Sequence, residues 1–200
     1  MPRARGSVDG ELFWWISHGI EAPEGGMAMP GFTEVLSEDE RWALMDWVRA
    51  NNAGLARAAA GAWSRPVQAP GLEARCAGGR DVTLSDLRGQ VVRAVFGIAP
   101  PAPGVVTILA TTDASVRPGA GLCAAGDETI PRAYATVSGI PLRDLPGTQI
   151  LVDGQGWLRA VWRPGTGPGW DDPGVLAAAV RGVEQHPLAP SGGEPMPMRM

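Results

Sequence analysis

The stretch Gln149-Ile-Leu-Val-Asp-Gly-Gln-Gly-Trp-Leu-Arg-Ala-Val-Trp162 decides the fold of the larger part of this chain. It contains two short apolar runs, 149–153 and 157–162, on either side of Gly154-Gln-Gly156. Two such runs joined by a glycine-containing turn predict a β-hairpin. This part of the chain is therefore expected to be built around a sheet.

Further strands are expected upstream of this hairpin. Residues 91–96 form one apolar run, and residues 105–110 form a second that contains almost only apolar side chains. A strand without alternation predicts burial on both faces, as at the centre of a sheet. The shorter run Val82-Thr-Leu84 leads into a turn at Asp86-Leu-Arg-Gly89.

Two helices are expected on either side of the hairpin. Residues 130–137 predict a short helix, and Asp171-Asp-Pro173 predicts the start of a last helix that extends to about Gln185. Proline favours the first turn of a helix, where its missing N–H costs nothing. Residues 187–200 are rich in Met and Pro and are expected to be a disordered tail.

The N-terminal part has a different pattern, which favours helices. A short apolar face at helical spacing is formed by Leu12, Phe13, Trp15 and Ile16. Gly19 is the expected end of this helix. A Gly/Pro/Met loop is expected to follow over residues 21–31.

A second helix is predicted by a capping motif. Ser37 and Glu40 form the S-x-x-E capping box, and Gly54 is the expected C-cap. After it, residues 55–79 have the composition of a linker, in which Trp63 is expected to dock onto a neighbouring element. These patterns divide the chain into a helical segment (7–54), a linker (55–79), a sheet domain (80–186) and a tail (187–200).

The sheet domain resembles the redoxin branch of the thioredoxin superfamily. The resemblance is carried by Val82-Thr-Leu-Ser-Asp-Leu-Arg-Gly89, by the strand at 91–96 and by the hairpin at 150–162. It implies an α/β thioredoxin-like fold. The reactive Cys-x-x-Cys of that superfamily is missing, because Gly97-Ile-Ala-Pro-Pro-Ala-Pro-Gly104 stands after the first central strand. These Pro-rich residues are too few for a crossover helix, so the domain is expected to lack its active-site helix and to be redox-inactive.

The N-terminal segment resembles the second half of a class I cytochrome c. The resemblance is carried, in this order, by Gly10-Glu-Leu-Phe-Trp-Trp-Ile-Ser-His-Gly-Ile20, Met29-Pro-Gly-Phe32 and Leu36-Ser-Glu-Asp-Glu-Arg-Trp42. It implies that Met29 takes the place of the thioether ligand to haem iron, with Pro30 and Gly31 holding the loop. A methionine opposite a histidine raises the potential of the iron, which suits an electron carrier.

The haem-attachment motif of that family, Cys-x-x-Cys-His, is absent from this chain. His18 is expected to serve at a helix end rather than as a replacement ligand. Covalent haem c is therefore expected only if the missing upstream half is supplied, and Met29 otherwise fills a hydrophobic gap.

The two segments together resemble the C-terminal part of multidomain bacterial proteins of the copper-resistance D family. That resemblance implies a periplasmic or envelope location, an upstream cytochrome or membrane domain, and a redox partner. We therefore interpret the chain as an electron-transfer protein fused to a thioredoxin-like domain. It contains no P-loop, no nucleotide-binding G-x-G-x-x-G, no G-x-S-x-G and no H-E-x-x-H, so no enzymatic activity is expected.

Two alternatives to electron transfer follow from the residues. The tail places three thioethers at alternate positions, which could bind Cu(I), at Met196, Met198 and Met200. The other alternative is a degenerate interaction domain without a cofactor.

Charge and cysteine content limit the function further. The net charge of −4 gives no electrostatic reason to expect nucleic acid or an anionic membrane surface as a partner, and no apolar run has the length of a membrane span or of a signal peptide. Cys76 and Cys123 are the only cysteines, and they are expected to be unpaired thiols, with a disulfide as the alternative in an oxidising compartment.

Overall fold

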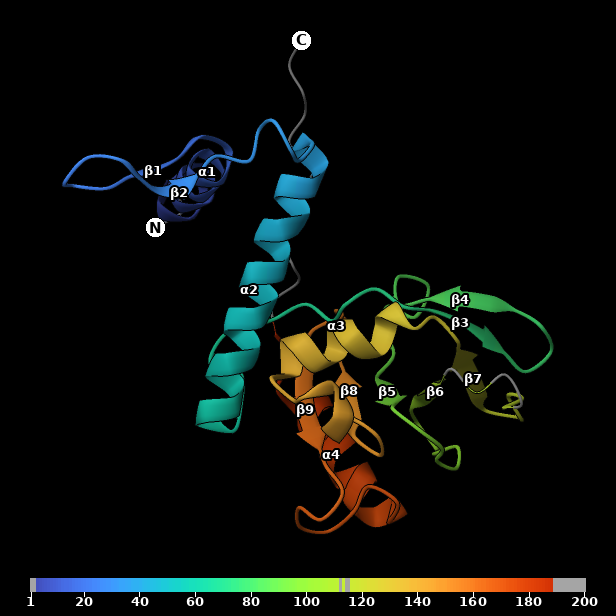
Figure 1. The fold of residues 1–200 in the computed structure, drawn as a ribbon. Coiled ribbons are helices and arrows are strands. Elements are labelled where there is room, and N and C mark those ends of the chain that lie inside the picture. The colour runs from blue at the N-terminus through green and yellow to red at the C-terminus, as the bar shows by residue number, and fades with distance from the viewer. Residues whose placement is uncertain (1–2, 112, 114–115, 189–200) are drawn as a thin grey trace. The chain divides into compact units, whose positions relative to one another are not determined.

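The computed structural model describes residues 3–111, 113 and 116–188. The chain divides into two compact units between Asn52 and Ala53. Each unit is described separately below, and Figure 1 labels their elements. No helix in the part of the chain that the structure describes is long and apolar enough to cross a membrane.

The first unit is a helix, a short hairpin and most of a second helix. Its elements are α1 (Arg3–His18), β1 (Gly19–Glu21), β2 (Met27–Pro30) and α2 (Glu38–Ala60), which continues into the second unit. The expected loop at 21–31 is wrong in part, because residues 27–30 pair with β1 in an antiparallel hairpin. The chain reverses through Gly25 and Gly26, whose positive φ angles of 86° and 91° suit glycine.

The capping box of α2 is confirmed. The backbone N–H of Ser37 donates to Oε2 of Glu40 over 2.8 Å, and the N–H of Glu40 donates to Oγ of Ser37 over 3.3 Å. The expected end of this helix at Gly54 is wrong, since α2 continues to Ala60. Gly54 lies where α2 meets the end of the next helix, and a Cβ there would overlap the carbonyl oxygen of Thr136. The glycine is therefore required by close helix packing and not by a cap.

The second unit is built on a seven-stranded mixed sheet. Its strand order is β4-β3-β7-β6-β5-β8-β9. Strands β5, β6 and β7 are parallel, and all other pairs are antiparallel. The strands are β3 (Glu73–Cys76), β4 (Asp81–Thr83), β5 (Val92–Val95), β6 (Val106–Ala110), β7 (Leu122–Ala125), β8 (Gln149–Val152) and β9 (Leu158–Trp162).

Helices α3 (Thr129–Ser138) and α4 (Pro173–Gln185) complete the unit, with a 3-10 turn η1 (Leu142–Asp144) before β8. The order β6-β5-β8-β9, with α3 before β8 and α4 after β9, is the expected thioredoxin-like arrangement, and the predicted hairpin and both predicted helices are confirmed. Asp172 caps α4 by accepting the backbone N–H of Gly174 over 2.7 Å.

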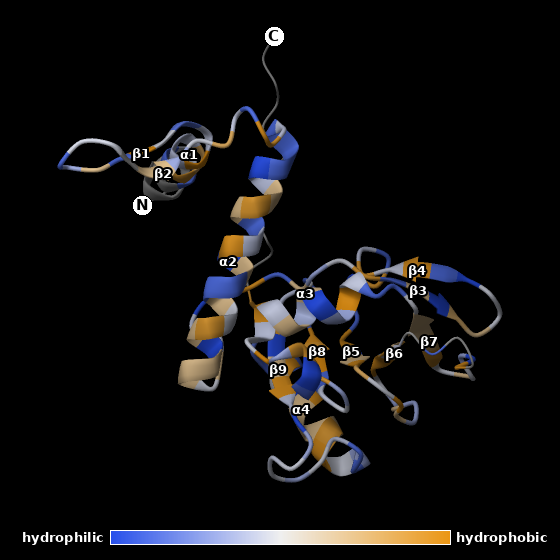
Figure 2. Ribbon diagram, viewed as in Figure 1, coloured by the Kyte–Doolittle hydropathy of each residue, from blue (hydrophilic) through white to orange (hydrophobic). Residues whose placement is uncertain are grey.

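The central strands β5, β6 and β8 are buried on both faces, as their apolar sequences predict. One face packs against α4 in a cluster formed by Val91, Leu151, Trp170, Leu176, Val180 and Val183. Phe96, directly after β5, contacts Tyr134 of α3, with ring centroids 5.3 Å apart. Figure 2 shows hydrophobic residues concentrated on β8, β9 and α4.

The segment expected to be a linker contains the end of α2 and strand β3, which lies between the edge strand β4 and β7. Trp63 docks as expected, since its indole N–H donates to the carbonyl of Val137 over 3.0 Å. Arg57, on the last turns of α2, donates to the carbonyl of Ser138 over 2.8 Å.

The expectation of two free thiols is wrong, because Cys76 and Cys123 form a disulfide. The two residues lie directly opposite each other on the antiparallel strands β3 and β7. The N–H of Ala77 donates to the carbonyl of Leu122, so the cysteines occupy a non-hydrogen-bonded pair. In such pairs the side chains are closest, which explains why this register brings the sulfurs together.

Candidate functional site

The position at which thioredoxins carry their thiols is occupied here by a loop. Residues 96–105 connect β5 to β6 without a helix, and the two strands nevertheless pair in parallel from Val92↔Val106 to Val95↔Leu109. The predicted loss of the active-site helix is therefore confirmed in the structure. No cysteine lies in this loop, so it has no nucleophile for disulfide exchange.

Arg93 binds this loop through a hydrogen bond from its guanidinium. Its side chain is 1% exposed although it lies in the middle of β5. Its Nε donates to Oε1 of Gln149 over 2.8 Å, and its terminal nitrogens donate to the carbonyls of Pro100 over 3.1 Å and Trp170 over 3.2 Å. The bond to Pro100 fixes the Pro-rich loop against the sheet.

The charge of Arg93 is partly compensated. The carboxylate of Asp171 lies 3.6 Å from the guanidinium and also accepts a hydrogen bond from Nε2 of Gln149 over 3.1 Å. Burial lowers the pKa of Arg93, while Asp171 acts in the opposite direction. With its donors on backbone carbonyls and a glutamine, Arg93 has a structural role. Sequence reasoning missed it, although an arginine inside the run 91–96 was a visible signal.

The predicted cytochrome-like residues lie on the hairpin of the first unit. Met29 is a half-buried residue of β2 that pairs with Ile20, and Pro30 is exposed opposite Gly19. Gly31 lies so close to the backbone of Ser17 and His18 that a Cβ would overlap it. This close backbone approach is enough to require a glycine at position 31, whether or not a ligand binds nearby.

His18 takes the helix-end position that the sequence predicts. Its Nδ1 lies 3.0 Å from the carbonyl of Trp14, and its ring stacks on Trp14 at 4.8 Å between centroids. The predicted pair in the first unit is therefore a half-buried thioether, Met29, and a histidine bound to its own helix. These residues do not by themselves fit a covalently held haem, because both cysteines of the chain lie in the other unit and are joined to each other.

The first unit buries little of its apolar surface. Among its described side chains, Met45 is the one apolar residue that is fully buried, at 2% exposure. Phe13 and Trp42 stack with centroids 4.3 Å apart. Large apolar side chains remain exposed at Trp14, Ile20, Val35, Trp42 and Trp47.

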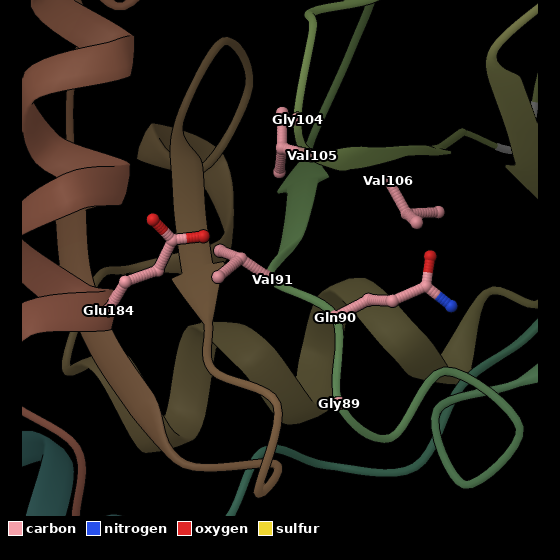
Figure 3. A pocket seen from close by; sticks show the side chains of 7 residues that line it. All are labelled: Gly89, Gln90, Val91, Gly104, Val105, Val106 and Glu184. Atoms are coloured by element: carbon pink, nitrogen blue, oxygen red, sulfur yellow. The ribbon is translucent and has the colours of Figure 1, made fainter.

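A groove lies at the opposite end of the parallel strands from the carboxyl end of β5. Its first part, shown in Figure 3, is a cavity of about 390 Å³ lined by Gln90, Val105, Val106 and Glu184 among others. An adjoining cavity of about 260 Å³ shares Gln90, Val105 and Val106 with it and is also lined by both cysteines and Arg80. The groove therefore reaches the disulfide.

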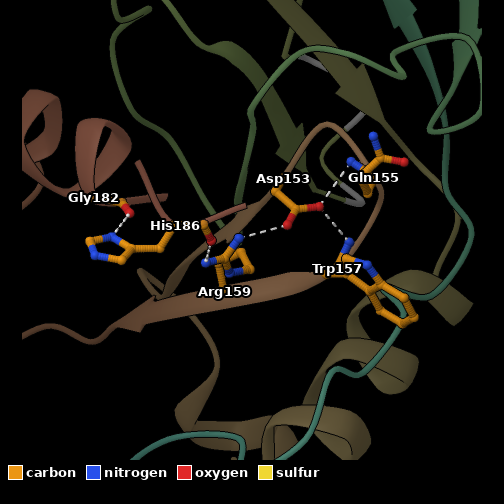
Figure 4. A network of polar contacts seen from close by, with 6 residues as sticks. All are labelled: Asp153, Gln155, Trp157, Arg159, Gly182 and His186. Carbon is orange, nitrogen blue, oxygen red and sulfur yellow. Dashed lines mark hydrogen bonds and ion pairs between the residues drawn. The ribbon is translucent and has the colours of Figure 1, made fainter. Parts of the chain in front are cut away.

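A polar network joins the turn of hairpin β8–β9 to the end of α4 (Figure 4). Asp153 is 8% exposed, and its Oδ1 accepts the backbone N–H groups of Gln155 and Trp157, each over 2.9 Å. Its other oxygen accepts from Arg159 over 2.8 Å, and Arg159 also donates to the carbonyl of His186. All of these contacts fix a turn and the end of α4, which indicates a structural network.

No group of three or more His, Cys, Asp or Glu side chains is placed to hold a metal ion in residues 3–111, 113 and 116–188. The predicted copper ligands Met196, Met198 and Met200 lie outside the described residues.

Comparison with known proteins gives structural likenesses only. No protein-family model matches the chain, and no curated protein does. Yeast Sco1 with copper bound is 11% identical over 62% of this chain and 97% of its own, with a TM-score of 0.41. Thioredoxin peroxidase I of Plasmodium yoelii is 16% identical over 63% of this chain and 96% of its own, with a TM-score of 0.44.

The exposed lipoprotein thioredoxin Etrx1 of Streptococcus pneumoniae is 17% identical over 57% of this chain and all of its own, with a TM-score of 0.39. None of these three is a cytochrome. By its strand order and the placement of α3 and α4, the second unit of this chain is a thioredoxin-like α/β domain.

Proposed function

We propose that this chain is the methionine-side part of an electron-transfer protein of the cytochrome c type, fused to a thioredoxin-like domain that has no Cys-x-x-Cys site. The observation that carries the proposal is the incomplete core of the first unit around Met29. A unit whose described side chains include one fully buried apolar residue and three exposed tryptophans needs a further surface to cover it.

The chemistry of the first unit is consistent with a segment that supplies the other half of the site. Met29 offers a soft, neutral thioether on a short hairpin held against α1 by Gly19 and Gly31. A covering segment would have to bring the attachment cysteines and the proximal histidine. A bound haem would supply one-electron exchange with a redox partner.

A haem peptide tests this proposal directly. A short peptide that carries covalent haem and its own Cys-x-x-Cys-His leaves one axial position open. We expect the full chain to bind it and to produce the weak long-wavelength absorption of methionine-ligated ferric haem. Met29→Ala should abolish that band, because it removes the thioether assigned as the ligand and leaves Met27, two residues away on β2, as the remaining methionine of the hairpin.

The matched control is Met27→Ala, two residues earlier on the same strand, which should keep the band. A spectrum of the wild-type mixture identical to that of free haem peptide would overturn the proposal. A band that survives Met29→Ala would refute the ligand assignment.

We place the protein in the cell envelope. The family resemblance of the sequence suggests this compartment, and the Cys76–Cys123 disulfide supports it, since disulfides persist mainly outside the reducing cytosol. Partners would then be an upstream cytochrome or membrane domain and an envelope redox protein.

Copper binding by the tail is a separate prediction that rests on the alternate thioethers Met196, Met198 and Met200. Truncation after Pro195 should remove Cu(I) affinity, measured by competition with a chromogenic Cu(I) chelator. Equal affinity of the truncated and full chains would exclude the tail as the site. If neither the haem peptide nor Cu(I) binds, the chain is an interaction domain without a cofactor.

A further inference from the structure

The disulfide lies at a place where thioredoxins do not carry their reactive cysteines. It joins the end of β3 to β7, beside the amino ends of the parallel strands. The family's usual site follows the carboxyl end of β5, where residues 97–104 stand here. The two positions are at opposite ends of the sheet.

The groove gives a solute access to the disulfide. The cavity of about 260 Å³ is lined by Cys76, Cys123 and Arg80, and it continues past Gln90 into the larger cavity of Figure 3. Both sulfur-bearing residues therefore border an open space and are not sealed in the core.

The turn between β3 and β4 places a cation beside the cysteines. The N–H of Cys76 donates to the carbonyl of Arg80 over 2.8 Å, and the chain reverses through Gly78 and Gly79, with φ angles of 85° and 82°. Arg80 therefore stays at the mouth of the cavity. Glu184 also lines this groove, Asp81 and Asp86 line an adjoining cavity, and Asp81 is paired with Arg75. A guanidinium that lines the same cavity as the disulfide attracts an incoming thiolate and favours the thiolate that leaves.

The two sulfurs are not equivalent. Cys76 is half-buried, whereas Cys123 is only 4% exposed. An incoming thiolate therefore meets the sulfur of Cys76 first, with Cys123 as the leaving group on the inner side.

We propose that Cys76–Cys123 is a redox-active disulfide that exchanges with thiols entering the groove past Arg80. The thiolate of the donor attacks Sγ of Cys76, the Cys76–Cys123 bond breaks, and Cys123 leaves as a thiolate that takes up a proton. A second thiol of the donor then attacks the donor sulfur of the mixed disulfide and releases Cys76 as a thiolate. In sum, one donor dithiol, or two monothiols, is oxidised and the protein disulfide is reduced to two thiols.

Reduction would loosen one edge of the sheet. The hairpin β3–β4 is joined to the rest of the sheet by two register pairs, Arg75↔Ala124 and Cys76↔Cys123, and the second of these is the disulfide itself. The redox state of the disulfide therefore determines whether the β3–β4 hairpin is covalently tied to β7. This inference does not depend on the haem proposal, because it involves no residue of the first unit.

Two thiol donors distinguish the possible sources. The folded full chain is incubated at neutral pH with reduced glutathione in one arm and with reduced thioredoxin in the other. Free thiols are trapped with a maleimide and located by peptide mass. We expect both cysteines to be labelled without denaturant, with the glutathione adduct trapped on Cys76. Reaction with glutathione indicates a small-thiol donor, and reaction with thioredoxin alone indicates a protein dithiol; both support the proposal.

The matched variants are Arg80→Gln at the groove and Arg132→Gln on the exposed side of α3. Arg80→Gln should slow reduction by the anionic glutathione roughly tenfold, a modest electrostatic effect for a cleft, and Arg132→Gln should leave the rate unchanged. A disulfide that is reduced only after denaturation would overturn the proposal. So would a glutathione adduct found mainly on Cys123, or equal rates for the two variants.

Discussion

Arg93 binds the loop that stands in place of an expected helix. In a thioredoxin-like fold a helix is expected between β5 and β6, where residues 97–104 form a loop here. Here a guanidinium below the loop binds the carbonyl of Pro100 and the side chain of Gln149. The fixed fork of an arginine can satisfy several acceptors that a shorter side chain would leave unpaired.

Replacing Arg93 with methionine should therefore destabilise the protein strongly. The change keeps most of the side-chain volume but leaves three acceptors without their donor, those on Gln149 and Trp170 being buried, at an expected cost of about 3 kcal/mol. The free energy of unfolding in urea measures the effect. Arg132→Met on the exposed surface of α3 is the control and should change it by less than about 0.5 kcal/mol. A loss of under about 1 kcal/mol for Arg93→Met would contradict the role assigned to this network.

The elements of the second unit were predicted from local sequence where they are apolar and continuous. The hairpin of β8 and β9, the strands β5 and β6, and the helices α3 and α4 all carry their own periodicity or capping signals. Strand β3 was missed because it lies between Pro/Gly-rich residues and alternates with exposed Glu73 and Arg75. Strand β7 was missed because Leu122-Cys-Ala-Ala125 is short and is defined by its partners, not by its own sequence.

The candidate sites were predictable only in part for the same reason. The loss of the thiol-bearing helix follows from the length and composition of residues 97–104. The disulfide and its groove depend on the pairing of β3 with β7, which lie 47 residues apart in sequence at the cysteines. No local pattern reports such a pairing.

Helix packing at Gly54 gives a test at the scale of elements. A Cβ at Gly54 would overlap the carbonyl of Thr136, and the glycine also lies against Gly139 at the end of α3. Gly54→Ala should therefore destabilise the protein by ~1–3 kcal/mol, because backbones that touch cannot give way. The midpoint of thermal unfolding measures this change.

The control is a glycine with free space around it. Gly182 lies inside α4 and has nothing within 4 Å of an added Cβ. Gly182→Ala should raise stability by ~0.5–1 kcal/mol through helix propensity. If the two substitutions have effects of the same sign, Gly54 is not a packing position.

The two units should differ in local stability. The second unit has a continuous core on both faces of its sheet, while among the described side chains of the first unit only Met45 is an apolar residue that is fully buried. Amide hydrogens of α1 and of the hairpin β1–β2 should therefore exchange much faster than those of β5, β6 and β8. Hydrogen exchange read by mass spectrometry checks this. Equal protection in both units would show that the first unit is complete in itself.

The disulfide also shapes how the molecule is made. During synthesis Cys76 leaves the ribosome well before Cys123, so the hairpin β3–β4 must wait for β7 before its edge can be covalently closed. Within these 200 residues two cysteines permit a single intramolecular pairing. Among the cysteines of these 200 residues, oxidation therefore has one intramolecular product, and folding of this domain has no choice of pairing to make.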